Sequence, residues 1–202
     1  SYGDLGISHH SSHDIAAFCA LTDMRVYLPS DRFQTAELIC ALLKDEKPAY
    51  VRVSRSATED VYDANLEFCL NRANVISEGK DAMLIACGEM VPYAVEAAAL
   101  LKETGIDVGV LDMYCLKPLD QEAVLKYAGK TKLLVTVEEH SIYGGLGSLV
   151  SQLTAEKCPV KVRQIALPDG HLIPGSNKEV FAYYGMDAKG IAETVNKTLA
   201  EG

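Results

Sequence analysis

Apolar positions recur along the chain at the spacings of helices and strands, and the two kinds of segment alternate. Helical spacing follows Asp14 and returns over residues 33–43 behind the capping residue Asp31, whereas runs over residues 24–29 and 49–55 are typical of strands. The order helix, strand, helix, strand favours a parallel α/β sheet. Two strands are too few for a complete doubly wound domain, so this unit is predicted to begin in its middle.

From Asn71 onward the pattern restarts. Strands are predicted at residues 73–77, 82–87, 108–113, 133–137 and 160–165, and helices at residues 91–104, 121–128, 147–156 and 188–199. Pro118 ends one element and Asp120 caps the helix that follows. The pattern predicts a second α/β domain with a sheet of about five strands. Residues 58–66 carry acidic side chains without apolar periodicity, which indicates a linker.

Length, charge and cysteine spacing restrict the function classes. A chain of 202 residues with 49% hydrophobic content can bury a sizeable core. A formal net charge of -9 without a run of basic residues argues against nucleic acid and anionic membrane surfaces as partners. The six cysteines lie at wide spacings without a CxxC pair, and no apolar stretch is long enough to span a bilayer. These features predict a cytoplasmic protein with reduced thiols and no metal site of its own.

Candidate chemistry is concentrated before residue 15, a segment that holds three of the five histidines. Gly3 and Gly6 allow the backbone to bend close to a bound molecule and to present His9 and His10 from a loop. Imidazole both donates and accepts hydrogen bonds near neutral pH, which suits it to sugar hydroxyls or to proton transfer. From residue types alone, a solvated, histidine-bearing helix start is the alternative.

Several motifs in a fixed order carry a family resemblance. They are residues 2–10 (YGDLGISHH), 28–31 (LPSD), 53–55 (VSR), 111–120 (LDMYCLKPLD) and 135–148 (VTVEEHSIYGGLGS). In order and spacing they resemble the transketolases and their thiamine-diphosphate-dependent relatives, over essentially the whole chain. The first is similar to the family's Gly-x-Thr-His-His loop, the second to its Pro-Ser-Asp strand end and the third to the strand that ends in a substrate-phosphate arginine. The last two resemble its C-terminal domain.

The resemblance implies a division of the chain. Residues 1–57 resemble the second half of a pyrimidine-binding domain, residues 58–67 a linker and residues 68–202 a complete transketolase C-terminal domain. In the family, the missing half carries the glutamate that contacts the cofactor's aminopyrimidine. A separate domain binds the diphosphate through a metal and a Gly-Asp-Gly motif, which this sequence lacks. The sequence therefore resembles a fragment or subunit of the full enzyme.

The implied function is transfer of a two-carbon ketol unit from a ketose phosphate to an aldose phosphate by the C-terminal portion of a transketolase. Thiamine diphosphate and a divalent metal, Mg or Ca, are the implied cofactors of the full enzyme, and we expect this chain alone to bind neither and to be inactive. The implied partners are sugar phosphates and either a second copy of the chain, as a homodimer, or a chain that carries the diphosphate-binding domain.

The resemblance also implies site residues. His9 matches the loop histidine and is the predicted catalytic residue, close to the reacting carbons. Arg55 matches the phosphate arginine, because a guanidinium offers two parallel donors to a phosphate. Without the resemblance, an arginine at a strand end is more often a surface ion-pair former. His10 and Asp4 complete the predicted substrate-binding set, although the family's acidic residue falls at Leu5 here.

Three alternatives stay open. Residues 10–14 (HSSHD) differ from the Gln-Pro-x-Glu that commonly follows the histidine in transketolases, so a 1-deoxyxylulose-5-phosphate synthase is one alternative. A non-catalytic assembly module is another. The third concerns the glycine-rich turn at 144–148 (GGLGS), where helix N–H groups could bind an anion although Glu138 and Glu139 before it would repel phosphate. A structural turn, with a subunit contact as an added role, is the favoured interpretation.

Overall fold

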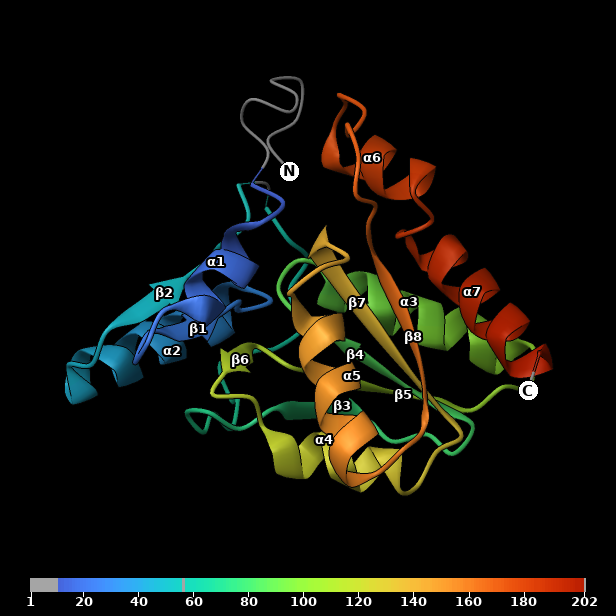
Figure 1. The fold of residues 1–202 in the computed structure, drawn as a ribbon, viewed down its shortest axis with the longest axis horizontal. Helices are drawn as coiled ribbons and strands as arrows, with labels where there is room; N and C mark the ends of the chain where they lie inside the picture. The colour runs from blue at the N-terminus through green and yellow to red at the C-terminus, as the bar shows by residue number, and fades with distance from the viewer. Residues whose placement is uncertain (1–10, 56, 202) are drawn as a thin grey trace.

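The computed structural model describes residues 11–55 and 57–201, which form two β-sheets flanked by helices (Figure 1). In chain order the elements are α1 (Asp14–Ala20), β1 (Arg25–Tyr27), α2 (Arg32–Asp45), β2 (Ala49–Val51), β3 (Asn74–Ser77), β4 (Ala82–Ala86), α3 (Met90–Glu103), β5 (Val108–Asp112), β6 (Cys115–Lys117), α4 (Gln121–Ala128), β7 (Leu133–Ser141), α5 (Leu146–Lys157), β8 (Lys161–Leu167), α6 (Asn177–Tyr183) and α7 (Ala188–Ala200). This alternation confirms the α/β class.

The larger sheet has five strands, the number that the sequence predicts, and their order is β3-β5-β4-β7-β8. β5, β4, β7 and β8 pair in parallel, and β3 pairs antiparallel to β5 at one edge. Every residue of β4 and β5 is buried. Parallel strands covered on both faces have no solvent side, which explains why these segments are continuous apolar runs without alternation.

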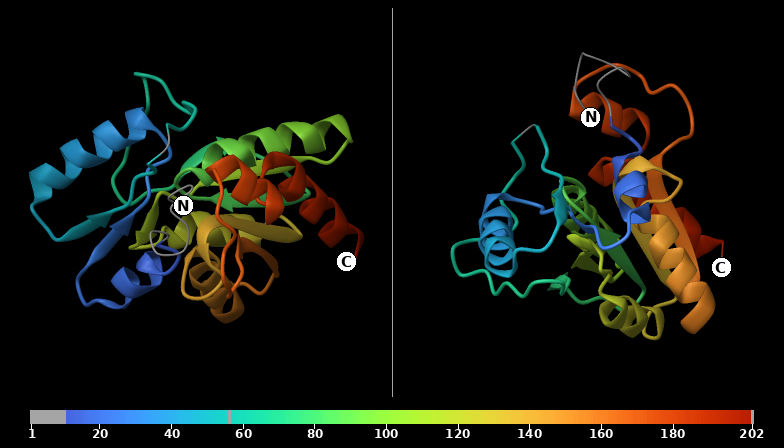
Figure 2. Two further views of the ribbon diagram at one scale, coloured as in Figure 1. Left: turned by 90° about the horizontal axis from the view of Figure 1, so that it is seen from above. Right: turned by 60° about the vertical axis from the view of Figure 1, so that its left-hand side comes forward.

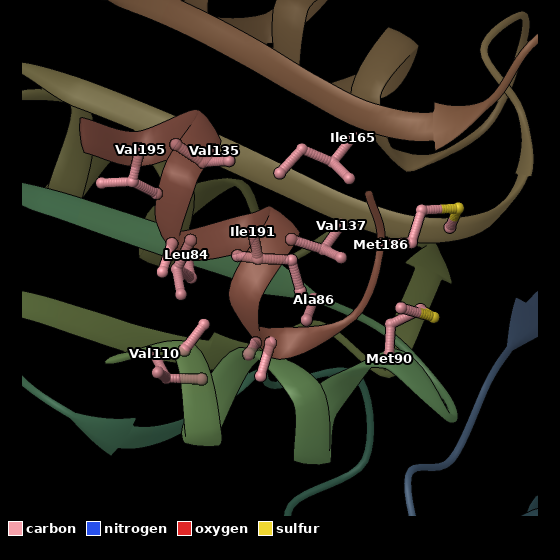
Figure 3. Packing of buried hydrophobic residues seen from close by; sticks show 14 of the residues in the cluster. Leu84, Ala86, Met90, Val110, Val135, Val137, Ile165, Met186, Ile191 and Val195 are labelled. Carbon is pink, nitrogen blue, oxygen red and sulfur yellow. The ribbon is translucent and has the colours of Figure 1, made fainter. Parts of the chain in front are cut away.

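Helices cover both faces of the five-stranded sheet. On one face α3 packs against α7, and Figure 3 shows Met90 of α3 and Ile191 of α7 in the same buried cluster as Leu84 and Val135 of the strands. All four side chains are 0% exposed. On the other face lie α4 and α5, which pack against each other and against β7. This two-sided burial is the main hydrophobic stabilisation of the chain.

The smaller sheet has the order β2-β1-β6, with β2 parallel and β6 antiparallel to β1. The strand β6 was not predicted; it comes from the C-terminal part of the chain and supplies a third strand to the first unit. The predicted strand at 49–55 ends earlier, at Val51. The helix α6 was not predicted either, although Ser176 and Glu179 form a capping box at its start.

The first unit shares its core with the C-terminal part of the chain. Viewed from above, α1 and α2 lie on opposite sides of the small sheet (Figure 2). Val26 and Leu38 from this unit belong to one buried cluster with Met83, Leu134 and Val150 of the second. The two units are therefore packed together through apolar side chains rather than connected only by a chain segment.

The segment predicted as a linker is bonded to both units, and the part of it that the structure describes contains neither helix nor strand. The Asp31 carboxylate caps α2 through the Gln34 N–H at 2.8 Å, as predicted, and also accepts the N–H groups of Val61 at 2.9 Å and Tyr62 at 2.7 Å. These bonds place the Tyr62 ring at the boundary between the two sheets.

A fully buried carboxyl, that of Asp112 in β5, connects the first unit, the linker segment and the five-stranded sheet. Its Oδ2 accepts hydrogen bonds from Ser30 Oγ at 3.0 Å, Gln34 Nε2 at 2.8 Å and Tyr62 OH at 2.8 Å. Its Oδ1 has no hydrogen-bond partner among the described residues. Burial raises the pKa of Asp112 to about 7, against the effect of these three donors. The joint between the units therefore contains a carboxyl that titrates near neutral pH.

Candidate active site

The carboxyl ends of strands from both sheets meet at one place. The residues that line a small hollow there follow β1, β2 and β4 or belong to β7: Leu28, Pro29, Arg52, Ser54, Cys87, Gly88, Glu89 and Glu139. The backbone joins the two sheets at this point, because the Gly88 N–H donates to the Leu28 carbonyl at 3.0 Å and the Leu28 N–H donates to the Tyr114 carbonyl at 2.7 Å. Loops at the carboxyl ends of parallel strands are where α/β proteins bind ligands.

A buried ion pair lies at the inner wall of this hollow. Arg52 pairs with the Glu139 carboxylate, and its Nη1 donates to the Glu139 carbonyl at 2.8 Å. The same Nη1 lies 3.4 Å from Asp14 Oδ1. The side chains of Arg52, Asp14 and Glu139 are 16%, 8% and 5% exposed. Because two carboxylates and a carbonyl surround this guanidinium, it is already compensated and is a poor candidate for a phosphate ligand.

Asp14 also accepts a hydrogen bond from Tyr50 OH at 2.7 Å. Burial and the neighbouring carboxylate raise the pKa of Tyr50 to about 12, so the phenol stays a donor at neutral pH. Phe18 of α1 stacks on the Tyr50 ring at 3.8 Å between centroids. The start of α1 is thereby attached to β2.

The end of β7 also bonds to the start of α1 and to the residues just before it. The Ser141 N–H donates to the Ser12 carbonyl at 2.7 Å, and the Ala16 N–H donates to Nε2 of His140 at 3.3 Å. Nδ1 of His140 lies 2.8 Å from the Ser141 carbonyl, which assigns the ring proton to Nδ1. Burial lowers the pKa of His140, in keeping with this neutral form.

The glycine-rich turn before α5 is filled by the protein's own carboxylate. Glu138 accepts the N–H groups of Leu146 at 2.6 Å and Gly147 at 2.7 Å. A Cβ on Gly145 would stand 2.0 Å from Glu138 Oε2, so only glycine fits beside this carboxylate. Burial raises the pKa of Glu138 to about 7. The structural interpretation of the turn is confirmed, and its role in a subunit contact stays a prediction.

Of the predicted site residues, the structure describes Arg55; His9, His10 and Asp4 lie outside the described residues. Arg55 is exposed and comes directly after Ser54, which lines the hollow; Arg55 is not itself among the lining residues. Its neighbour Ser54 donates through Oγ to Glu89 Oε2 at 3.0 Å, and Asn177 Nδ2 of α6 donates to the same oxygen at 2.9 Å.

The sequence analysis missed Arg52, Asp14 and Glu89 as parts of this site, and it treated Glu139 only as a source of repulsion. A signal was present, because Glu138 and Glu139 directly follow the apolar run of β7. Carboxylates in such a position are buried and need a cation or N–H donors. Which cation pairs with them depends on the approach of β2, which the sequence does not show.

The described residues do not fit the diphosphate and metal of a bound cofactor. No group of three His, Cys, Asp or Glu side chains in that part of the chain could hold a metal ion. The N-terminus of α5, a potential anion site, accommodates Glu138 instead. The hollow contributes Glu89 and Glu139, whose charge disfavours a phosphate. The described residues therefore do not form a diphosphate site.

The two sheets with flanking helices and a shared hollow at the strand ends make this an α/β protein with a site between its two units. Comparison with known proteins identifies the family. The family model of the transketolase C-terminal domain matches residues 71–191, and that of the transketolase pyrimidine binding domain matches residues 1–60. The chain belongs to the transketolase family, which is thiamine-diphosphate-dependent.

Individual relatives agree with this assignment. The chain is 45% identical over 195 residues to a subunit of the apulose-4-phosphate transketolase of Phocaeicola vulgatus, covering 96% of this chain and 62% of that protein. It is 34% identical over 203 residues to 1-deoxy-D-xylulose-5-phosphate synthase of Dehalococcoides mccartyi, covering 98% of this chain and 31% of that protein. A solved structure described as a split gene transketolase, inactive beta4 tetramer, superposes with a TM-score of 0.88 at 35% identity, over 96% of this chain and 62% of the other.

In the described part of the chain, no helix is long and apolar enough to cross a membrane. Its cysteines are all free, which agrees with the predicted reduced thiols.

Proposed function

We propose that this chain supplies the substrate-facing part of a transketolase, which transfers a two-carbon ketol unit from a ketose phosphate to an aldose phosphate. The relative from Phocaeicola vulgatus, itself one subunit of a transketolase, supports this function. Pentose phosphates and related sugar phosphates are the proposed substrate class. The location is the cytoplasm, and nucleic acid is not a partner, in keeping with a net charge of -9.

One structural observation carries the proposal. The segment that follows His9 and the strand end that carries Arg55 are both attached to the C-terminal domain at the same end of its sheet, through Ser141 and Glu89 respectively. His9 then acts near the reacting carbons as a hydrogen-bonding and proton-transfer group. Arg55 binds the distal phosphate, and His10 and Asp4 contact substrate hydroxyls.

The cofactors of the complete enzyme are thiamine diphosphate and Mg or Ca, and a partner chain holds the diphosphate and metal. This assignment follows from the poor fit of the described residues to a diphosphate, given above. The assembled enzyme is a complex of this chain with that partner, or a dimer of such pairs. A solved relative described as an inactive beta4 tetramer supports a further point: this chain alone self-associates and has no ketol-transfer activity.

The proposal is tested by reconstitution. This chain is purified alone and together with the chain that carries the diphosphate-binding domain, and both samples receive thiamine diphosphate, Mg, a ketose phosphate donor and an aldose phosphate acceptor. We expect the chain-shortened and chain-extended sugar products from the complex only. Turnover by this chain alone would contradict the assignment of the cofactor to the partner, and an inactive complex with every sugar pair would contradict the function.

A second candidate function, 1-deoxyxylulose-5-phosphate synthesis, is favoured by the 34% identity to the Dehalococcoides mccartyi enzyme. The same reconstituted sample distinguishes the two functions by mass spectrometry of its products. Formation of 1-deoxyxylulose 5-phosphate without ketol transfer would replace the first proposal by the second. Activity of neither kind, with stable association, would favour the assembly module.

A further inference from the structure

Arg52 contacts every element that leads to the predicted reacting groups. It precedes Arg55 after the end of β2, and its partner Asp14, at the start of α1, follows His9 in the sequence. Its second partner, Glu139, belongs to β7 of the C-terminal domain. One guanidinium therefore joins the start of α1 and the end of β2 to a single residue of β7.

The chemistry of this cluster requires an arginine. Nη1 donates to the Asp14 carboxylate and to the Glu139 carbonyl, and Nη2 donates to the Glu139 carboxylate. A lysine ammonium on a flexible stem does not reproduce this planar arrangement of donors. Formal charges of two carboxylates and one guanidinium leave the cluster one negative charge in excess, at side chains that are at most 16% exposed. Apolar side chains of similar volume commonly stabilise such a site equally well. A fixed geometry, rather than stability alone, is thus the property that this cluster supplies.

A second arginine provides the contrast. Arg25, at the opposite end of the same small sheet, makes a bidentate pair with Asp45 at 2.6 and 2.9 Å. That pair joins β1 to the end of α2 within the first unit, and neither partner lines the hollow. It is an ion pair of similar kind with a structural role only, and so a matched control.

We propose that Arg52 and Glu139 are a positioning pair, which holds the start of α1 and the end of β2 against β7. The inference rests on the proposed function and deepens it. The pair lines the hollow, but its charged groups are engaged with each other and with Asp14, so its role is positioning. It acts by fixing the described segments that adjoin His9 and Arg55 in the sequence before the substrate binds.

The test compares Arg52→Lys, Glu139→Gln and the control Arg25→Lys in the reconstituted complex with its partner chain. We expect Arg52→Lys and Glu139→Gln to lower kcat at least 10-fold with phosphorylated and unphosphorylated acceptors alike, because misplacement affects the chemical step. Arg25→Lys should leave kcat within about 2-fold of that of the unmodified complex. Its melting temperature should fall by a few degrees, as in the other two variants. The double variant of Arg52 and Glu139 should lose no more than the worse single variant, since the two residues act as one unit.

Hydrogen–deuterium exchange of peptides covering residues 11–20 gives a readout that does not depend on activity. In the Glu139→Gln chain the Ala16 amide region should exchange at least 5-fold faster, and in the Arg25→Lys chain it should not change. Unchanged kcat and exchange in folded Glu139→Gln would overturn the inference, as would an equal loss of kcat in Arg25→Lys. If the complex transfers no ketol unit at all, the proposed function fails, whereas the exchange result still decides whether the pair holds this segment.

Discussion

The two sheets of this protein differ in how completely they are covered. The five-stranded sheet is buried on both faces by helices of its own domain, whereas the small sheet takes its third strand, β6, from that domain. Within the described residues, β2 forms one edge of the small sheet and β6 the other. On α2, the side chains of Ala36, Ile39, Cys40 and Leu43 form an exposed apolar stripe at helical spacing. A sheet covered on both faces thus supports a smaller sheet that takes a strand from the same domain, and the predicted Arg55 follows a strand of the smaller one.

The comparison predicts that stability depends mainly on the larger sheet. Leu84 is 0% exposed, whereas Leu43 is 72% exposed. We expect Leu84→Ala to lower the free energy of unfolding by about 2–5 kcal/mol through lost burial and a residual cavity. Leu43→Ala should change it by no more than about 0.5 kcal/mol. Urea denaturation at one fixed protein concentration measures both. Equal losses in the two variants would show that the units are equally well packed.

The joint between the units should respond to pH. Asp112 has its pKa raised to about 7 in the folded chain from an ordinary value of 3.8, so the folded state retains a proton that the unfolded state has lost. The free energy of unfolding should therefore fall between about pH 4 and pH 7 by up to about 4 kcal/mol from this group, with no further loss above.

Asp112→Asn removes this titration, because the amide oxygen accepts the same donors without a charge. Relative to the wild type, the variant should gain stability as the pH rises from 4 to 7. Thermal unfolding across this range measures the difference. A difference that is independent of pH would show that Asp112 ionises normally.

The segments next to the smaller sheet should control activity rather than stability. In the reconstituted enzyme, Arg55→Ala should lower kcat/KM for phosphorylated sugars. The fall should correspond to a loss of about 2–4 kcal/mol of transition-state stabilisation, the usual scale for a charge-assisted pair with a desolvated phosphate. Unphosphorylated acceptors should be almost unaffected. Steady-state kinetics with matched acceptors decides this point. An equal loss for both acceptors would return Arg55 to the role of a structural ion-pair former.

His9→Ala should lower kcat by about 10²-fold or more for both kinds of acceptor, because a group near the reacting carbons affects the chemical step. Its melting temperature should match that of the unmodified chain. Rapid-quench measurement of a single turnover separates this loss from product release. A loss confined to KM would move His9 from catalysis to substrate binding.

The smallest effect on stability is expected at the α2 stripe. Ile39→Ser with Leu43→Ser should change the free energy of unfolding by about 0.5 kcal/mol or less, since both side chains are exposed. The same double variant should weaken self-association of the isolated chain, because exposed apolar stripes favour association. Sedimentation velocity at tens of micromolar measures the shift. An unchanged distribution would place the contact elsewhere, for example at the free edge of β2.

The sequence by itself determined the elements whose signal is local. The apolar runs of β4, β5 and β7 and the caps at Asp31 and Asp120 correspond to the structure, because burial on both faces and capping are written in neighbouring residues. The order of motifs also identified the family. These features need no knowledge of which segments meet in space.

Tertiary structure alone decided what joins the two units. The three-residue strand β6 forms because β1 offers it an edge, and nothing in its own sequence distinguishes it from a turn. Likewise, Arg52 finds Glu139 across the boundary between the sheets, at a separation of 87 residues. A buried charge requires a partner, but only the packing of the sheets determines which one.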